Sequence, residues 1–407
     1  MPPIFTIIQQ PQEFTPAYND HIFVVNSLNS SETNYKYIAK VYAGDNVITL
    51  KQFPDPIYGS IYFNVGKIVE QLVTQDIDKN NTGFQMNLNS FNTYYIEFYE
   101  EYDISGVLTI SELLATSNTI KIYNAEIDFL LYQSYNQQTY LVDYSKSALN
   151  HNLRRSIELG QDSWIHWMCE AVTKVLKVEL KTYDINGTLN GRFTITNPYQ
   201  TNANIDEHFM RFPSGTNNLL SISSGSWTVI SGATPVIDSD VKSYAITLVP
   251  TDGEKYTTYS FDIVEADCIH ETIRLHYLNN LGAFESFNFT KASKRTETIK
   301  HDKYKAIVGT LTGSGYSYNI SDINEKVFST VIKDKYSIQS DWISQEYQNV
   351  LEQLVTSPVV YWDNEGYGLI SVNVITDSFE WKKNKTTKMI QLQLEFEVGF
   401  DRYRQRY

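Results

Sequence analysis

Ile390-Gln-Leu-Gln-Leu-Glu-Phe-Glu-Val-Gly-Phe400 places an apolar residue at every even position and a polar residue or glycine at every odd one. A strict period of two is typical of a β-strand that buries one face. The stretch before it alternates too, with apolar positions at Ile370, Val372 and Val374. Its phase slips by one residue before Phe379 and Trp381, which indicates a bulge or bend. Leu369–Phe400 therefore predicts a long C-terminal β-hairpin, connected through the polar residues 382–388.

The composition predicts a mainly β protein with several domains of sandwich or barrel type. The chain has 407 residues, of which 14% are aromatic, with 30 Tyr and 20 Phe. A disordered chain has few aromatic residues, so this one is expected to fold. Tyr, Phe, Val, Ile and Thr favour the pleated surface of a sheet. Tyr is also enriched where protein surfaces meet, but core filling explains the aromatic excess equally well.

Charge and cysteine content exclude several classes. A net charge of −14 argues against broad electrostatic binding to nucleic acid. Arg402, Arg404 and Arg406 form a small positively charged group. A solvated tail is favoured for them over a phosphate-binding site. Cys169 and Cys268 do not make a disulfide framework, and whether they lie close together stays open. Neither a signal-peptide pattern nor a run of 18 apolar residues occurs, so we expect synthesis in a cytoplasm and no membrane span.

Three domains are expected along the chain. Residues 1–148 predict an N-terminal β domain that starts with an extended Pro- and Gln-rich segment. Residues 149–295 predict a β-sandwich-like domain, because short strands recur at roughly ten-residue spacing between Gly, Ser and Asp turns. Residues 296–407 predict an α+β region that ends in the long hairpin. The basic stretch that begins at Lys291 suits either a linker or an exposed crossing strand.

Two short helices interrupt the strands in this prediction. The first begins at Asn64, and its apolar positions recur at helical spacing through Val73. The second is capped by Ser340 or Asp341 and is stopped by Pro358. Helical and strand patterns compete between Trp164 and Thr182, and a strand is favoured from Val175 onward. Strands are also expected at Ile127–Tyr132 and Leu219–Ile222.

No catalytic, cofactor-binding or metal-binding motif is present, so we expect no enzyme activity, no cofactor and no metal. His166 with Cys169 and Cys268 with His270 are fragments of a zinc site at best. The carboxylate pairs Glu100/Glu101 and Asp238/Asp240 are interpreted as turn and edge residues rather than as a glycosidase pair. Trp227 and Trp362 lie near predicted turns, which makes them candidates for stacking on a sugar, although core roles are favoured.

His276-Tyr-Leu-Asn-Asn-Leu-Gly-Ala-Phe-Glu-Ser-Phe-Asn-Phe289 resembles a segment of many tailed-bacteriophage structural proteins, where it marks a strand, a tight turn and a strand. The turn here would be Asn280–Ala283, with Phe284, Phe287 and Phe289 as anchors. The segment 357–400 is similar to the closing region of tail-tip, distal-tail and baseplate components. The opening Pro16–Asn19, followed by a strand, also fits that group. The resemblance implies a ring-forming component of the virion tail, with no catalytic residues to carry over.

Our first hypothesis is therefore a structural protein of a tailed-phage particle, most favoured at the tail tip or baseplate. It would be assembled in the host cytoplasm into a trimeric or hexameric ring, with other tail proteins as partners. The alternative is a virion protein that binds a carbohydrate or receptor on the host surface, and a third hypothesis is a glycan-degrading enzyme with a carboxylate pair in a cleft. The candidate interface residues are Phe379, Trp381, Lys383, Lys385, Phe284 and Phe287.

Overall fold

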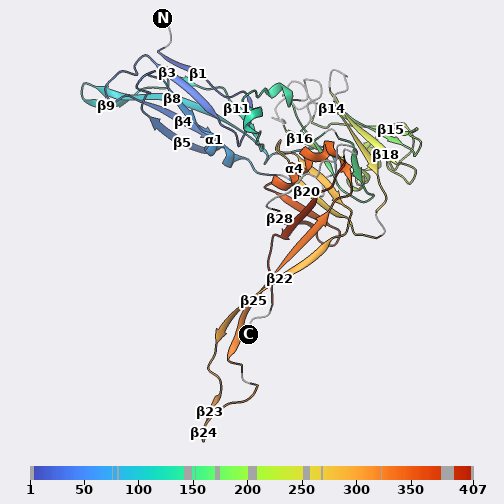
Figure 1. Ribbon diagram of the computed structural model, residues 1–407. Coiled ribbons are helices and arrows are strands. Elements are labelled where there is room, and N and C mark those ends of the chain that lie inside the picture. The colour runs from blue at the N-terminus through green and yellow to red at the C-terminus, as the bar shows by residue number, and fades with distance from the viewer. Residues whose placement is uncertain are drawn as a thin grey trace. The chain divides into compact units, whose positions relative to one another are not determined.

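The computed structural model describes residues 4–75, 77–79, 82–141, 149–151, 153–169, 175–199, 209–250, 257–266, 269–321, 323–376 and 389–404. Strands dominate, which confirms the prediction of a mainly β protein with several sheets (Figure 1). The chain divides into two compact units. The first holds Met1–Glu265 and Leu278–Glu285, and the second holds Ala266–Tyr277 and Ser286–Tyr407. The three expected domains, 1–148, 149–295 and 296–407, stay a prediction.

The first unit begins with two sheets. The smaller sheet has the order β1-β3-β6, with bounds Phe5–Gln9, Ile22–Ser27 and Ile61–Asn64. The larger has the order β2-β11-β8-β4-β5, with bounds Phe14–Pro16, Ile120–Tyr123, Phe91–Ile104, Lys36–Ala43 and Asn46–Gln52. β9 (Val107–Ile110) and β10 (Ala115–Thr116) also pair with β8. The short helices of this region are α1 (Gly66–Val69), η1 (Glu70–Leu72), α2 (Phe129–Tyr132) and η2 (Gln137–Thr139).

Period-two alternation explains the packing of these sheets. Tyr94, Ile96 and Phe98 of β8 are buried, whereas the residues between them lie on the outer face. The buried cluster also takes Phe23 from β3 and Phe63 from β6, so it joins the two sheets. The predicted strand at 127–132 is wrong, because Phe129–Tyr132 forms the one-turn helix α2.

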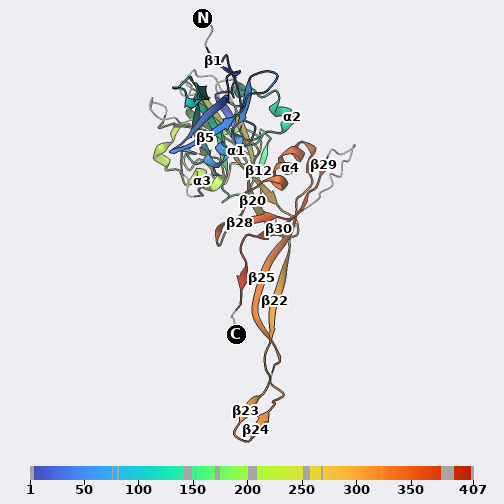
Figure 2. The same cartoon turned by 90° about the vertical axis from the view of Figure 1, so that its left-hand side faces the viewer.

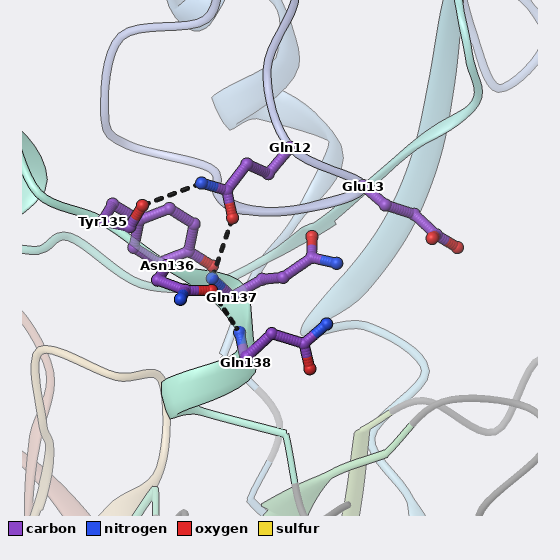
Figure 3. A pocket seen from close by; sticks show the side chains of 6 residues that line it. All are labelled: Gln12, Glu13, Tyr135, Asn136, Gln137 and Gln138. Atoms are coloured by element: carbon purple, nitrogen blue, oxygen red, sulfur yellow. Dashed lines mark hydrogen bonds between the residues drawn. The ribbon is translucent and has the colours of Figure 1, made fainter. Parts of the chain in front are cut away.

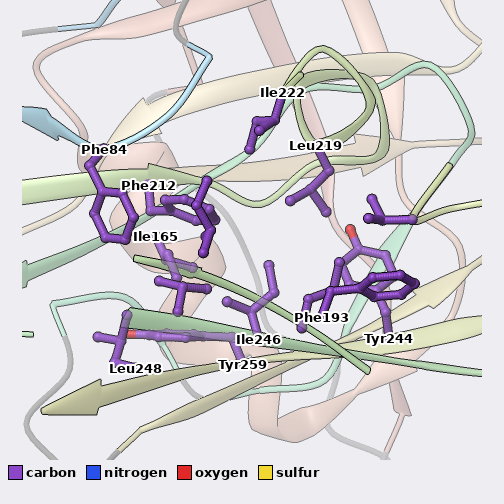
Figure 4. Packing of buried hydrophobic residues seen from close by; sticks show 14 of the residues in the cluster. Phe84, Ile165, Phe193, Phe212, Leu219, Ile222, Tyr244, Ile246, Leu248 and Tyr259 are labelled. Atoms are coloured by element: carbon purple, nitrogen blue, oxygen red, sulfur yellow. The ribbon is translucent and has the colours of Figure 1, made fainter. Parts of the chain in front are cut away.

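The rest of the first unit is a pair of sheets around a second core. The larger has the order β12-β19-β18-β14-β15-β17, with bounds Arg155–Ile157, Thr258–Ile263, Ser243–Pro250, Val175–Tyr183, Leu189–Thr196 and Thr228–Ser231. The smaller has the order β13-β16-β7, with bounds Trp164–Met168, Phe209–Pro213 and Gln85–Met86. Figure 4 shows side chains of both sheets packed together, among them Ile165, Phe212, Phe193 and Ile246.

The structure decides between the two competing patterns in this region and corrects one predicted strand. The strand predicted from Val175 is confirmed, and the competing helical pattern at Trp164 is wrong because that stretch forms β13. The strand predicted at 219–222 is also wrong, because α3 (Thr216–Leu220) covers its start and the short helix η3 (Ser224–Ser226) follows. Leu219 lies in α3 and Ile222 lies in the loop after it, and both side chains are buried. Their apolar character therefore reflects burial and not a strand.

The second unit is built on one sheet with the order β21-β20-β27-β28-β30-β25-β22. The bounds are Phe284–Phe289, Ile273–Leu278, Val360–Asn364, Gly368–Val374, Gln393–Val398, Glu325–Gln339 and Lys294–Lys305, and β31 (Arg402–Tyr403) pairs with β25. The smaller elements are β23 (Thr310–Thr312) with β24 (Gly315–Ser317), β26 (Ile343–Ser344) with β29 (Met389–Ile390), η4 (Gln345–Tyr347) and α4 (Gln348–Thr356).

The turn between β20 and β21 lies where a strand, a tight turn and a strand are predicted in His276–Phe289. The Asn279 side-chain oxygen accepts hydrogen bonds from the backbone N–H groups of Leu281 (3.0 Å) and Ala283 (2.9 Å). Gly282 has a φ of +82°, and a side chain at this position would collide with the carbonyl oxygen of Asn124. The motif thus requires glycine here for both backbone conformation and space.

The closing hairpin is present in part. β28 pairs with β30, and Leu392, Leu394 and Phe396 are buried, as the alternation predicts. The strand predicted as continuous from Ile390 to Phe400 is instead broken after β29. At the break, the Ser340 hydroxyl oxygen accepts a hydrogen bond from the backbone N–H of Leu392 (2.9 Å), and Ser340 N–H donates to the Leu392 carbonyl (2.8 Å). The predicted connection 382–388 lies outside the described residues.

The predicted second helix starts later than expected. Ile343 and Ser344 form β26, so neither Ser340 nor Asp341 caps a helix. The Ser344 side chain instead accepts a hydrogen bond at the start of η4, and α4 follows from Gln348. Val350, Leu351 and Leu354 are buried, which confirms the apolar stripe. In the first predicted helix, only α1 and η1 form after Asn64.

Candidate assembly surface

The second unit contains a long hairpin, and its first strand lies in the basic stretch after Lys291, for which an exposed strand is one of the two predicted alternatives. β22 and β25 pair from Lys294 opposite Ser337 to Lys305 opposite Glu325, with a bulge between Asp302 and Lys303. Every residue of β22 is exposed. We call residues 294–339 the projecting hairpin and residues 306–324 its tip. Figures 1 and 2 show β23 and β24 at the end of this hairpin that is remote from the other strands of its unit.

The tip has a defined fold of its own. β23 and β24 pair, and the Tyr316 hydroxyl donates a hydrogen bond to the Val308 carbonyl at 2.6 Å. Gly309 has a φ of +103°, and a side chain there would collide with the ring of Tyr316. The rings of Tyr316 and Tyr318 meet edge to face at 5.2 Å. These contacts order the tip, so its side chains are presented on a structured scaffold.

Apolar side chains are exposed along the projecting hairpin. Ile307 and Leu311 are 93% and 78% exposed. The full set of exposed large apolar or aromatic residues is Ile299, Tyr304, Ile307, Leu311, Tyr316, Tyr318, Ile320, Ile323, Val327 and Phe328. Single exposed apolar residues are ordinary, but a group on one element is typical of an interaction surface.

Four charged side chains form a network at the base of the projecting hairpin. Asp334 Oδ1 accepts hydrogen bonds from Nη2 of Arg402 (2.8 Å) and Nη2 of Arg295 (3.0 Å). The same two nitrogens donate to Glu297 Oε1, at 2.8 and 3.1 Å. The network therefore joins β22, β25 and β31. It also gives Arg402 a structural role, which differs from the solvated tail expected for the C-terminal arginines.

The network makes a pH prediction. Burial alone would raise the pKa of the Asp334 carboxyl, but the hydrogen bonds and charges of Arg402 and Arg295 hold that pKa below its usual value. A lowered pKa in the folded state stabilises the fold above the ordinary carboxyl pKa, and this contribution is lost as the pH falls through the lowered value. Asp334→Asn is expected to cost about 1 kcal/mol at pH 6, and this cost is expected to shrink as the pH falls below the ordinary carboxyl pKa. Thermal unfolding of both proteins across the acidic range tests it, and a difference that does not shrink with falling pH contradicts it.

Of the six predicted interface residues, the structure describes two, Phe284 and Phe287. Phe379, Trp381, Lys383 and Lys385 lie outside the described residues. Phe284 is buried, so the structure does not support it as a surface anchor. Phe287 is half-buried, and its ring lies 5.1 Å from Phe289 and 6.3 Å from Tyr347. The exposed apolar set lies instead on a segment whose sequence looks basic and polar.

The two candidate sugar-stacking tryptophans are buried. Trp227 is 6% exposed and packs edge to face on Phe193 and Phe212, although it also forms part of the wall of a pocket of about 390 Å³. Trp362 packs on Tyr336 at 5.0 Å and Phe396 at 6.0 Å. Both rings are almost fully buried, so neither is an exposed platform for a sugar and the structure does not support the predicted sugar contact.

The burial of both rings gives a direct test. Trp227→Phe and Trp362→Phe are each expected to lower the free energy of unfolding by about 1–2 kcal/mol, because a smaller ring leaves a gap in the core. Binding to a glycan array is expected to stay unchanged in both variants. Urea unfolding and the array measure the two effects, and loss of a glycan signal in either variant would restore the sugar-binding interpretation.

The carboxylate pairs do not form a glycosidase site. Glu100 and Glu101 are adjacent in β8, so their side chains point to opposite faces of the sheet. Glu101 pairs with Lys36 at 3.1 Å and also with Lys51. The Asp238 side chain caps a turn by accepting a hydrogen bond from Asp240 N–H at 2.9 Å. A retaining or inverting glycosidase needs two carboxyl groups that face one cleft, and neither pair meets that requirement.

A shallow polar pocket of about 530 Å³ lies in the first unit (Figure 3). It is lined by Gln12, Glu13, Tyr135, Asn136, Gln137 and Gln138. Gln12 spans it, because its side chain donates to the Tyr135 carbonyl (2.8 Å) and accepts from Gln137 N–H (2.9 Å). The Glu13 carboxylate pairs with Lys121 at 2.8 Å. The amide groups of this pocket therefore hold the N-terminal segment against residues 135–138.

A buried hydrogen-bonded chain of Ser, His and Asp occurs in the second unit. His276 Nδ1 lies 2.7 Å from Ser286 Oγ, and His276 Nε2 lies 3.3 Å from Asp363 Oδ2. These residue types match a hydrolase triad, but they are side chains of neighbouring strands, and the imidazole is fully buried. A buried histidine with both ring nitrogens near polar partners is typical of a structural role.

Within the described residues, no group of three or more His, Cys, Asp or Glu side chains is placed to hold a metal ion. Cys169 is buried, and Cys268 lies outside the described residues. No helix in the described part of the chain is long and apolar enough to cross a membrane.

Comparison with known proteins adds little. No family model and no curated protein matches the chain. One matching solved structure is a tri-modular GH5 (subfamily 4) endo-beta-1,4-glucanase from Bacillus licheniformis in complex with cellotetraose. The identity is 9%, the TM-score is 0.17, and the match covers 64% of this chain and 39% of that chain. A likeness this weak supports no conclusion about fold or activity.

Proposed function

We propose that the protein is a structural subunit of a tailed-bacteriophage particle, which assembles into a ring at the tail tip or baseplate. In this role it joins the tail tube to the host-recognition parts and works without catalysis. The observation that carries the proposal is the projecting hairpin, whose ordered tip exposes Ile307, Leu311 and Ile320. A hairpin of this kind suits the interface between ring subunits, because exposed apolar groups gain free energy when a neighbour covers them.

Two further observations support the proposal. The segment His276–Phe289 resembles a phage structural motif, and its strand–turn–strand form requires the glycine at position 282. The ion-pair network of Arg295, Asp334 and Arg402 braces the base of the projecting hairpin, so the tip is held on a supported strand pair. A braced hairpin loses less conformational freedom on docking, which favours stable assembly.

The test is the mass of the purified protein. Light scattering across a dilution series is expected to give a trimer or hexamer at high concentration, and negative-stain electron microscopy is expected to show closed rings. Dilution should shift the mass toward the monomer, because association depends on concentration. A monomer at every concentration, with no rings in the images, contradicts self-assembly and therefore the proposed function.

A further inference from the structure

A second exposed apolar surface lies in the first unit, on helix α2. Phe129, Leu130 and Leu131 are consecutive and are 70%, 78% and 59% exposed. Three consecutive exposed apolar residues are unusual on a soluble protein unless they serve a function. Glu126 and Asp128 lie just before them and are also exposed. We call these five residues the α2 patch.

The α2 patch is held in place from both ends. Before the helix, the Asn19 side chain donates to the Ile127 carbonyl (2.7 Å) and accepts from Ile127 N–H (2.8 Å). At its end, the Tyr132 hydroxyl donates to the Asp20 carbonyl at 2.6 Å. Ile127 itself is buried. These contacts anchor Ile127 and Tyr132, so the four exposed residues between them, 128–131, are presented rigidly.

The surroundings of the α2 patch are acidic. Burial raises the pKa of the nearby Tyr18 hydroxyl, the carboxylates of Glu70 and Glu126 raise it further, and Lys67, which pairs with Glu70, lowers it. The whole of residues 1–148 is also negatively charged, because it holds 16 Asp and Glu against 7 Lys and Arg, a net charge of −9. An apolar, positively charged partner would complement this surface.

The projecting hairpin has that character. Residues 294–339 hold 8 Lys and Arg against 5 Asp and Glu, a net charge of +3 in a chain of net charge −14. Lys300, Lys303 and Lys305 lie on β22 just before the tip, and all three are exposed. The exposed apolar residues of the tip follow directly. Lysines and apolar side chains therefore stand side by side on this hairpin, as carboxylates and apolar side chains do on the α2 patch.

We propose that the tip of the projecting hairpin of one copy docks on the α2 patch of a second copy. The inference rests on the proposed ring assembly and names the two surfaces that meet in it. The apolar tip covers Phe129, Leu130 and Leu131, and the β22 lysines face the carboxylates. Because the two surfaces differ, the contact is head-to-tail, which is the kind of contact that closes into a ring.

A mixing experiment tests the contact. The tip variant replaces residues 306–324 with Asn-Gly, and the patch variant carries Phe129→Ser, Leu130→Ser and Leu131→Ser. Each variant loses one of the two surfaces, so each alone is expected to be monomeric, with the dissociation constant raised roughly 100-fold or more. Mixed in equal amounts, they are expected to form a complex of two chains and nothing larger, because one intact tip meets one intact patch. Sedimentation velocity measures all three samples.

A matched control uses another exposed apolar group of the first unit. Ile104→Ser, Val107→Ser and Leu108→Ser change three exposed residues of the β8–β9 hairpin, and this variant is expected to assemble as the unchanged protein does. Circular dichroism confirms that each variant is folded. If the patch variant assembles normally, or if the mixture forms no complex, the docking inference is overturned while ring assembly stands. If the unchanged protein never assembles, the proposed function itself fails.

Salt gives a second readout of the same contact. Raising the salt concentration from 0.05 to 0.5 M is expected to weaken assembly of the unchanged protein about tenfold, because screening reduces the attraction between the lysines and the carboxylates. A variant with Lys300→Glu and Lys303→Glu is expected to show the opposite dependence, with assembly that improves as salt rises. Assembly that is equally salt-sensitive in both proteins contradicts the assigned charge pairing.

Discussion

Replacing residues 306–324 with an Asn-Gly turn is expected to convert the assembled protein to monomers. Lys305 and Glu325 pair directly, so a two-residue turn can join them without disturbing the remaining ladder. The change removes Ile307, Leu311 and Ile320 with the rest of the exposed tip, and with them the apolar area that assembly would bury. Light scattering should show the mass of a single chain at concentrations where the unchanged protein forms a ring.

Two variants control for the length of the tip and for apolar substitution in general. Ile307→Ser, Leu311→Ser and Ile320→Ser in a tip of full length should weaken assembly as well, since the side chains rather than the backbone supply the contact. Ile185→Ser changes an exposed residue in the turn after β14 and should have no effect. Neither change should alter the thermal unfolding of the monomer, because these side chains belong to no core. A tip variant that still assembles would show that another surface holds the ring.

Arg155→Met is expected to destabilise the first unit by about 3–5 kcal/mol, the cost of leaving a buried charge without its partner. Arg155 Nη2 donates to both carboxylate oxygens of Glu285, at 2.9 and 3.2 Å, and both side chains are largely buried. The guanidinium also lies 5.6 Å from the Tyr259 ring centre and 5.8 Å from that of Phe261. Methionine keeps most of the apolar part of the arginine side chain, so the measured loss of stability reflects the missing charge.

Arg154→Met is the matched control, since the neighbouring residue also pairs with a carboxylate. Arg154 is 59% exposed and binds Asp262, which is 39% exposed, so this substitution should cost less than about 1 kcal/mol. Urea unfolding followed by tryptophan fluorescence, to which Trp164, Trp167 and Trp227 of the first unit contribute, measures both variants. Hydrogen exchange should also become faster in β12 and β19 of the Arg155 variant. Equal effects of the two substitutions would show that burial does not decide the strength of these pairs.

Alternation was the strongest local signal and was correct where one face of a strand is buried. It predicted the inward side chains of β30, among them Leu394 and Phe396. It could not predict the break after Ile390, because Ser340 meets Leu392 only after the chain has folded. The same limit applies to Leu219 and Ile222, whose apolar side chains enter the core from a helical turn and a loop.

The candidate assembly surface was the least predictable part. β22 is made mainly of charged and polar residues, with Ile299 and Tyr304 as exceptions, and all of its residues are exposed. Period-two alternation arises when one face of a strand is buried, so it cannot reveal a strand that is exposed on both faces. Four of the six predicted interface residues are aromatic, and of these Phe284 is buried.

The sequence by itself determined the mainly β class, the inward and outward faces of the alternating strands and the glycine-dependent turn at Gly282. Each of these follows from contacts between near neighbours along the chain or from the backbone conformation of one residue, whereas the close approach of Asn124 to Gly282 is a tertiary contact. Only the tertiary structure decided which strands pair, which aromatic residues are buried and where exposed apolar groups gather on the projecting hairpin and on α2. Those outcomes depend on residues far apart in the sequence, such as Arg155 with Glu285 or Asp334 with Arg402, whose meeting no local pattern encodes.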